Sequence, residues 1–105
     1  MNNFKVIVTP VAKDDLADII AYLQDFGKGI AKRYRDEIMK KLRFIGKVPN
    51  VGALVRVDEL RSEGIRWTNF KNYMIFYTFN EEKCEVIIRH IAYGKRDLNK
   101  LFGKD

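Results

Sequence analysis

The chain has 105 residues, a net charge of +6 at pH 7 and an apolar fraction of 47%. This length permits one domain with a single core, residues 1–105, and the apolar runs are much shorter than the roughly 20 residues of a membrane-spanning helix. The only cysteine, Cys84, cannot form an internal disulfide, and the first residues carry no apolar signal core. We therefore expect one cytoplasmic domain without a membrane segment.

The positive charge is concentrated in two segments. Residues 27–47 carry +6 and residues 89–105 carry +3, whereas residues 1–26 and 48–88 are slightly negative. Such basic segments suit a phosphate backbone or an acidic protein surface. An ordinary solvated helix face is the alternative for the first segment.

The first half of the chain predicts a strand and two helices. Phe4–Thr9 is a short β-branched strand. Thr9 suits the N-cap and Pro10 the first position of a helix that ends at Gly27 and Gly29. Ile30 to Gly46 then carries apolar residues at helical spacing, so a second helix should follow and pack antiparallel to the first.

The second half predicts three consecutive strands. They are placed at Gly64–Phe70, Tyr73–Phe79 and Cys84–Ala92, with tight turns between them. Lys47 to Leu60 has no clear periodicity and is expected to be a loop with short extended pieces, and Asp97–Phe102 is a short amphipathic helix. The fold class is α+β: a four-stranded, antiparallel-rich sheet with a two-helix hairpin on one face and a short C-terminal helix.

Several short landmarks occur in an informative order. They are Thr9-Pro10 with Ala12 and Leu16, then Gly64-Ile65-Arg66, Tyr73-Met74-Ile75-Phe76-Tyr77, Arg89-His90 and Gly94-Lys95-Arg96-Asp97-Leu98. In this order and spacing they resemble the RelE/ParE superfamily of small bacterial toxins over nearly the whole chain. The resemblance implies the order βααβββ, with the first strand beside the last.

The resemblance leaves two targets open, because RelE-type toxins cleave mRNA on the ribosome and ParE-type toxins poison DNA gyrase. RelE-type proteins resemble one another in a strand-two cation, an Arg directly after the strand-three Tyr, a C-terminal Arg and a C-terminal Tyr. Arg66 and Arg96 match the first and third of these. However, Met74 follows Tyr73, and Phe102 stands where the terminal Tyr is expected. Met carries no charge and Phe donates no proton, so the pattern favours a ParE-like binding protein over a nuclease. Tyr93 is an alternative proton donor in place of the missing Tyr, so RNA cleavage stays open.

The last strand raises the question of an acid–base group. Alternation places Ile88, His90 and Ala92 on one face and Arg89 and Tyr93 on the other, with Arg66 near them if the register allows. His90, the only histidine, has a side chain suited to acid–base work at neutral pH, although a packed, hydrogen-bonded role is the alternative. The candidate catalytic residues under a ribonuclease reading are Arg66, Arg89, His90, Tyr93 and Arg96.

Other chemistries have little support. One Cys and one His cannot build a usual zinc site, and the chain has no nucleotide-binding or nucleophilic-serine motif, so we expect no metal and no cofactor. The acidic pairs Asp14-Asp15, Asp36-Glu37 and Glu81-Glu82 are interpreted as surface residues. Trp67 is either a recognition anchor or part of the core.

The exposed parts of the predicted sheet and the family resemblance both imply a protein partner. A sheet with helices on one face leaves its other face and an edge strand uncovered, which invites another chain. The resemblance implies a cognate acidic antitoxin, encoded beside the toxin, that folds on binding and forms a hetero-oligomer. Its expected contacts are Tyr22, Tyr34, Trp67 and Phe70. The expected target-binding residues are Arg66, Trp67, Arg89, Tyr93, Lys95, Arg96 and Phe102.

Three functions are consistent with the sequence. The first is a ParE-like, plasmid-stabilising toxin of a type II toxin–antitoxin module that arrests bacterial growth by inhibiting gyrase. The second is a metal-independent mRNA endonuclease that acts on the ribosome. The third is a nontoxic relic that only binds antitoxin.

Overall fold

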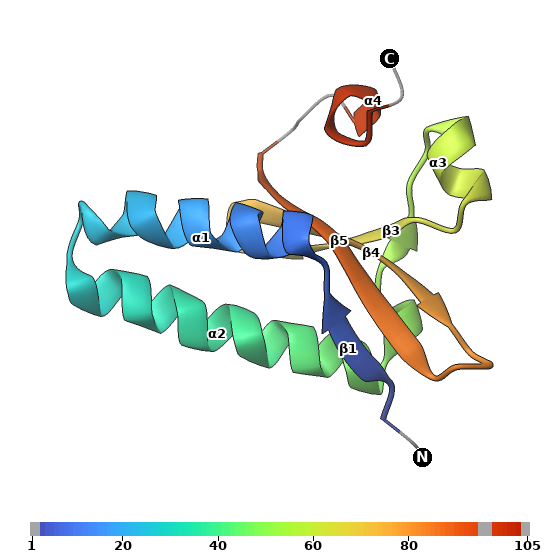
Figure 1. Ribbon diagram of the computed structural model, residues 1–105, viewed down its shortest axis with the longest axis horizontal. Helices are drawn as coiled ribbons and strands as arrows, with labels where there is room; N and C mark the ends of the chain where they lie inside the picture. Colours follow the sequence, from blue (N-terminus) through green and yellow to red (C-terminus); the bar gives the residue numbers. More distant parts are fainter. Residues whose placement is uncertain (1–2, 95–97, 104–105) are drawn as a thin grey trace.

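The computed structural model describes residues 3–94 and 98–103. It has a five-stranded sheet in the order β1-β5-β4-β3-β2, in which β1 is parallel to β5 and the other neighbours are antiparallel. The elements are β1 (Lys5–Val8), α1 (Pro10–Gln24), α2 (Lys28–Lys47), a 3-10 helix η1 (Pro49–Val51), β2 (Ala53–Leu54), α3 (Asp58–Ser62), β3 (Arg66–Phe70), β4 (Tyr73–Asn80), β5 (Glu85–Tyr93) and α4 (Leu98–Leu101). In Figure 1, α1 and α2 form an antiparallel hairpin on one side of the sheet, and α3 and α4 lie away from that hairpin. The α+β class and the placement of β1 beside β5 are therefore confirmed.

Thr9 joins the first strand to the first helix. Its Oγ1 accepts a hydrogen bond from the Ala12 N–H at 3.2 Å, as predicted for an N-cap, and donates one to the Ile88 carbonyl at 2.8 Å. The Thr9 N–H reaches the same carbonyl at 3.2 Å. One residue thus caps α1 and fixes the start of that helix to β5.

The main core lies between the helical hairpin and the sheet. Ala12, Ile38, Leu42 and Ile45 of the helices pack against side chains of β4 and β5. Gly46 lets α2 approach β1, because a Cβ at this position would lie 2.9 Å from the Phe4 carbonyl oxygen. Close packing of α2 here leaves its opposite face to solvent.

A second core covers part of the other face of the sheet. Leu60 of α3 and Leu98, Leu101 and Phe102 around α4 pack with Phe76 and Ala92 of the sheet. This face was expected to be bare, and that expectation is wrong. The segment from Lys47 to Leu60, expected to be a loop with short extended pieces, supplies η1, the short strand β2 and the first residues of α3, so the sheet has five strands instead of four. Elements of two to five residues are too short to show a periodicity in sequence.

An irregularity in the register shifts the alternation of β5. Phe76 pairs with His90 and Tyr77 with Ile88, so Arg89 lies between two pairs without a partner of its own. Ile88 belongs to the main core and faces the helices, whereas Phe76, the partner of His90, belongs to the second core. The predicted shared face of Ile88 and His90 is therefore wrong, and the reason is one inserted residue.

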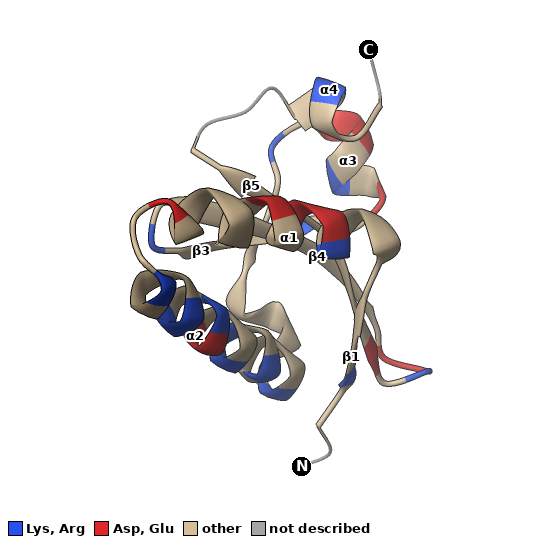
Figure 2. Cartoon of the chain, turned by 60° about the vertical axis from the view of Figure 1, so that its left-hand side comes forward, with Lys and Arg blue, Asp and Glu red and all other residues tan. Residues whose placement is uncertain are grey.

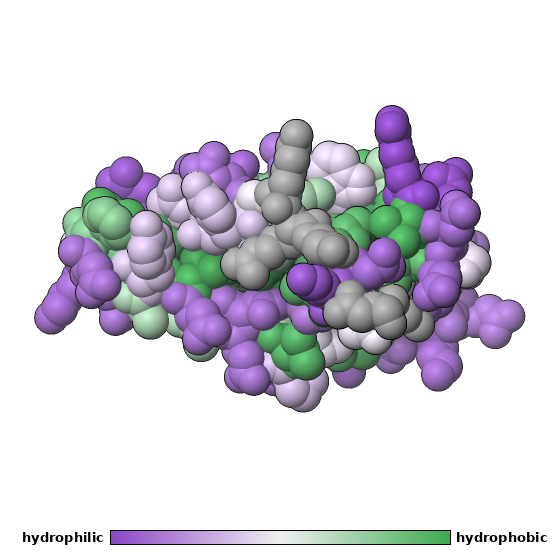
Figure 3. All heavy atoms as spheres, turned by 90° about the horizontal axis from the view of Figure 1, so that it is seen from above, coloured by the Kyte–Doolittle hydropathy of each residue, from purple (hydrophilic) through white to green (hydrophobic). Residues whose placement is uncertain are grey.

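The surface combines scattered apolar side chains with charged ones. Figure 3 shows separate apolar patches among hydrophilic side chains, including one at the left-hand end over the turn between α1 and α2. Phe26 and Ile30, on either side of this turn, are 60% and 40% exposed. No helix in the described part of the chain is long and apolar enough to cross a membrane.

Candidate functional site

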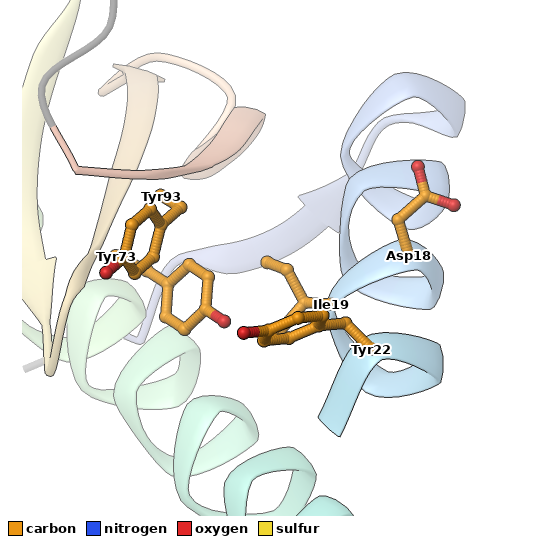
Figure 4. A pocket seen from close by; sticks show the side chains of 5 residues that line it. All are labelled: Asp18, Ile19, Tyr22, Tyr73 and Tyr93. Carbon is orange, nitrogen blue, oxygen red and sulfur yellow. The ribbon is translucent and has the colours of Figure 1, made fainter. Parts of the chain in front are cut away.

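A shallow aromatic pocket lies where α1 passes the ends of β4 and β5. Tyr73 begins β4, Tyr93 ends β5, and the two are register partners with ring centroids 5.4 Å apart. Asp18, Ile19 and Tyr22 of α1 complete the lining of a cavity of about 330 Å³. In Figure 4 the side chain of Tyr22 extends from α1 toward the tyrosines of the sheet. Tyr22 and Tyr93 are 60% and 59% exposed, so two large aromatic side chains are open to a partner.

Tyrosine hydroxyl groups and the exposed carboxylate of Asp18 set the polar character of this pocket. Burial raises the pKa of the Tyr73 hydroxyl above its ordinary value of 10.0, and the neighbouring Tyr34, Tyr22 and Tyr93 raise this pKa further. The Tyr73 phenol is therefore neutral at physiological pH. Aromatic walls with neutral hydroxyl groups, and the Asp18 carboxylate beside them, suit an apolar or aromatic side chain of a peptide, with hydrogen bonds to fix its orientation.

A second group of polar side chains lies where α1 meets β5. The Oδ2 atom of Asp15 lies 3.1 Å from Nδ1 of His90 and accepts a hydrogen bond from the Ile91 N–H at 2.9 Å. Strand β1 pairs with β5 only from Glu85 to Ile88. The Asp15 carboxylate therefore satisfies an edge N–H of β5 beyond the end of β1. The same carboxylate also contacts Nδ1 of the His90 imidazole and so orients the ring.

Phe102 connects this pair to the second core. The centroid of its ring lies 4.8 Å from that of His90 and 5.7 Å from that of Phe76, both in edge-to-face geometry. The Arg89 guanidinium lies 5.8 Å from the same ring centroid. Arg89, His90 and Phe102 are thus brought together, on the side of the sheet opposite α1 and α2.

The side chain of Arg66 makes its contacts within the fold. Its Nη1 donates a hydrogen bond to the Gly52 carbonyl at 2.7 Å, and its guanidinium lies 5.5 Å from the ring centroid of Phe79. The buried Tyr77 holds the same segment, because its hydroxyl accepts from the Gly52 N–H at 2.8 Å and donates to the Pro49 carbonyl at 2.6 Å. Both side chains anchor the η1–β2 segment to the sheet.

The predicted common face of Arg66, Arg89 and Tyr93 does not form. Arg66 pairs with Tyr77, whose side chain lies in the main core, and Tyr93 pairs with Tyr73 at the other end of the sheet. Arg89 projects beside Phe102 on the opposite face. The register irregularity at Arg89 separates it from Tyr93, because it exchanges the two faces of β5 within one residue.

The predicted antitoxin contacts fall in three places. Tyr22 lines the aromatic pocket, whereas Tyr34 and Phe70 pack edge-to-face at 6.1 Å beneath the Lys71 ammonium. Trp67 is 37% exposed and is paired with Ala53 of β2 at the far side of the sheet, so its side chain is at the surface. Lys95 and Arg96, together with Asp97 of the predicted C-terminal helix, lie outside the described residues.

Sequence reasoning missed Asp15. The pair Asp14-Asp15 was interpreted as surface, yet Asp15 is half-buried and contacts residues 75 and 76 positions away. Glu37 of another acidic pair also has a partner, since its Oε2 lies 3.2 Å from Lys71 Nζ. Acidic residues at the start of a helix are expected from the helix dipole alone, so no local signal distinguished Asp15 from Asp14. Among the described residues, no three His, Cys, Asp or Glu side chains group as metal ligands.

The helical hairpin and the sheet order define the RelE/ParE fold of small toxins. Residues 6–98 match the family described as "ParE toxin of type II toxin-antitoxin system, parDE". The chain therefore belongs to the ParE toxin family and is a ParE-type toxin of a type II toxin–antitoxin system.

Solved structures agree on the fold. The chain is similar to one in the chromosomal ParDE system from P. aeruginosa, with 18% identity and a TM-score of 0.73 over 88% of this chain and 97% of that one. It is also similar to one in the toxin–antitoxin complex RelBE2 from Mycobacterium tuberculosis, with 19% identity and a TM-score of 0.57 over 88% and 99% of the two chains. No curated protein matches this sequence.

Proposed function

We propose that this toxin inhibits DNA gyrase by direct binding and is neutralised by a cognate antitoxin. Family membership supports a toxin of the ParE type. The observation that carries the choice of target is the dispersal of the cations and the tyrosine that RNA cleavage would need. A binding protein requires no such convergence.

Metal-free RNA cleavage needs a base, a cation and an acid around one phosphate. Arg66 is engaged with Gly52 on the helix side of the sheet, and Arg89 lies on the other side. Met74 and Phe102 occupy the positions of the missing Arg and Tyr, and both contribute apolar surface to the second core. The side chains of Met74 and Phe102 therefore stabilise the fold and supply neither a charge nor a proton.

The aromatic pocket supports an antitoxin as partner. Tyr22 and Tyr93 expose large aromatic surfaces beside Ile19, and such rims are typical of sites that bind an apolar side chain of a peptide. The two similar solved structures come from toxin–antitoxin systems. We infer that a segment of the antitoxin docks here and forms a hetero-oligomer with the toxin.

The test is gyrase-catalysed supercoiling of relaxed plasmid in the presence of increasing amounts of purified toxin. We expect supercoiling to fall and cleaved DNA to accumulate with toxin concentration, and both effects to disappear when antitoxin is added. Arg89→Gln should weaken inhibition, whereas Lys83→Gln, which removes the same charge from an exposed turn, should not. A folded, antitoxin-free toxin that leaves gyrase fully active would refute the proposal.

Cleavage of mRNA on the ribosome is the second candidate. It is favoured by the cluster in which the Asp15 carboxylate orients His90 next to Arg89. The test is primer extension on mRNA in translating ribosomes, with Met74→Arg combined with Phe102→Tyr as the variant that restores the missing groups. Cleavage by the unaltered toxin would establish this candidate, and inactivity in both assays would leave a relic that binds antitoxin.

A further inference from the structure

The outer face of α2 is a strongly basic surface of the described chain. Eight of the twenty residues of this helix are Lys or Arg and two are acidic. All the basic residues except Lys41 are exposed, and Ala31, Ile38, Leu42 and Ile45 hold the opposite side of the helix in the core. Figure 2 shows the basic residues along the length of α2 and the acidic ones along α1. The hairpin thus presents one basic helix and one acidic helix.

Within the described residues, no ion pair neutralises a basic side chain of α2. In the described part of the chain, the ion pairs are Lys71 with Glu37 and His90 with Asp15, and neither uses a basic residue of α2. Asp36 is the one carboxylate within the basic face, since Glu37 is bound to Lys71. A surface of one sign without internal partners attracts an external polyanion.

The shape and composition of this face favour a nucleic-acid duplex. A segment that folds on binding needs continuous apolar surface to bury, and such surface is found at the aromatic pocket, which no residue of α2 lines. The exposed apolar residues of α2, which are Ile30, Met39 and Phe44, are separated along the helix by charged residues. A single strand needs several aromatic rings for stacking, and the exposed face of α2 offers only Phe44. A rigid helix of 20 residues extends about 30 Å, over which a duplex strand presents roughly one phosphate every 3.4 Å.

We propose that the outer face of α2 binds the phosphate backbone of duplex DNA, independently of sequence. This goes beyond the proposed function, because it assigns a direct DNA contact to the toxin itself. In a complex with gyrase, such a contact would hold the toxin against the DNA that the enzyme carries. Binding to DNA alone requires no gyrase, so the two proposals fail separately.

The test is fluorescence anisotropy of a labelled 20-base-pair duplex with antitoxin-free toxin at 50 to 200 mM salt. The variant Lys32→Gln/Lys40→Gln/Arg43→Gln removes three charges from the face and keeps good helix formers. The control Lys13→Gln/Arg61→Gln/Lys83→Gln removes three exposed charges from α1, α3 and the β4–β5 turn. Circular dichroism melting verifies that both variants are folded.

We expect the α2 variant to bind the duplex at least about tenfold more weakly. The slope of the logarithm of its binding constant against the logarithm of the salt concentration should be shallower by about 2.7, because each of three lost phosphate contacts contributes roughly 0.9. The control should bind like the unaltered toxin. The proposal would be overturned by no duplex binding at 50 mM salt, by equal weakening by both variants, or by unchanged duplex binding while binding to poly-glutamate falls. The last would assign the face to an acidic protein. A single-stranded RNA of equal length should bind more weakly than the duplex, and stronger binding would also refute the choice of partner.

Discussion

Replacing Asp15 by Ala should destabilise the toxin more than any other change of an acidic residue on α1. The Asp15 carboxylate makes two contacts, one with the Ile91 N–H and one with His90, and its side chain is 27% exposed. Hydrogen bonds to a charged group contribute about 1.5–3 kcal/mol each, so two would sum to about 3–6 kcal/mol, and the partial exposure of the carboxylate lowers this sum. Ile91 is 3% exposed, so its N–H would lose an acceptor in a buried position. We expect a loss of about 2–3 kcal/mol in the free energy of unfolding.

The matched control is Asp14→Ala. Asp14 is the neighbouring residue of the same helix turn and is exposed, so both substitutions gain the same helix propensity and lose the same interaction with the helix dipole. Urea denaturation of both variants gives the difference, which corresponds to a melting temperature about 10 to 20 °C lower for Asp15→Ala. The effect of Asp15→Ala in a His90→Ala background measures the contribution of the hydrogen bond from the Ile91 N–H to the free energy of unfolding. A difference below about 0.5 kcal/mol between the two aspartate variants would show that the link between α1 and β5 contributes little.

Three further predictions concern the tyrosines. Tyr77→Phe should cost about 1–3 kcal/mol in urea denaturation, because the buried Gly52 N–H and the Pro49 carbonyl both lose their partner. Burial raises the pKa of Tyr73 and Tyr77 above 10.0, so the unfolded chain releases these protons first. Stability should therefore be complete below pH 10 and fall as the pH rises above it, and melting curves from pH 8 to 11 that show no decline would contradict this. Tyr93→Ala should weaken antitoxin binding about tenfold in calorimetry, as expected for a pocket aromatic, with little change in melting temperature because Tyr93 is 59% exposed.

Much of the fold could be predicted because its signals are local. Thr9-Pro10 fixes the start of α1 through capping chemistry, and the apolar spacing of α2 predicts the burial of Ile38, Leu42 and Ile45, although Ile30 is 40% exposed. Short elements gave no such signal. β2 has two residues and α3 has five, and each exists because β3 or the second core supplies a partner. The role of Asp15 depends on residues 75 positions away and has no local signature.

The candidate site was harder to predict because one residue of β5 decides its geometry. On both sides of Arg89 and His90, the strand carries apolar residues toward both faces, so alternation alone gives no sign that the faces exchange at Arg89. That exchange moves Arg89 to the side of Phe102 and leaves Tyr93 beside Tyr73 at the aromatic pocket. The same irregularity thus separates two groups that a nuclease would need together and gives each surface a different composition, one with charged residues of both signs around Arg89 and one aromatic. Two surfaces of different chemistry are what a toxin requires if it must hold a target and an antitoxin at distinct sites.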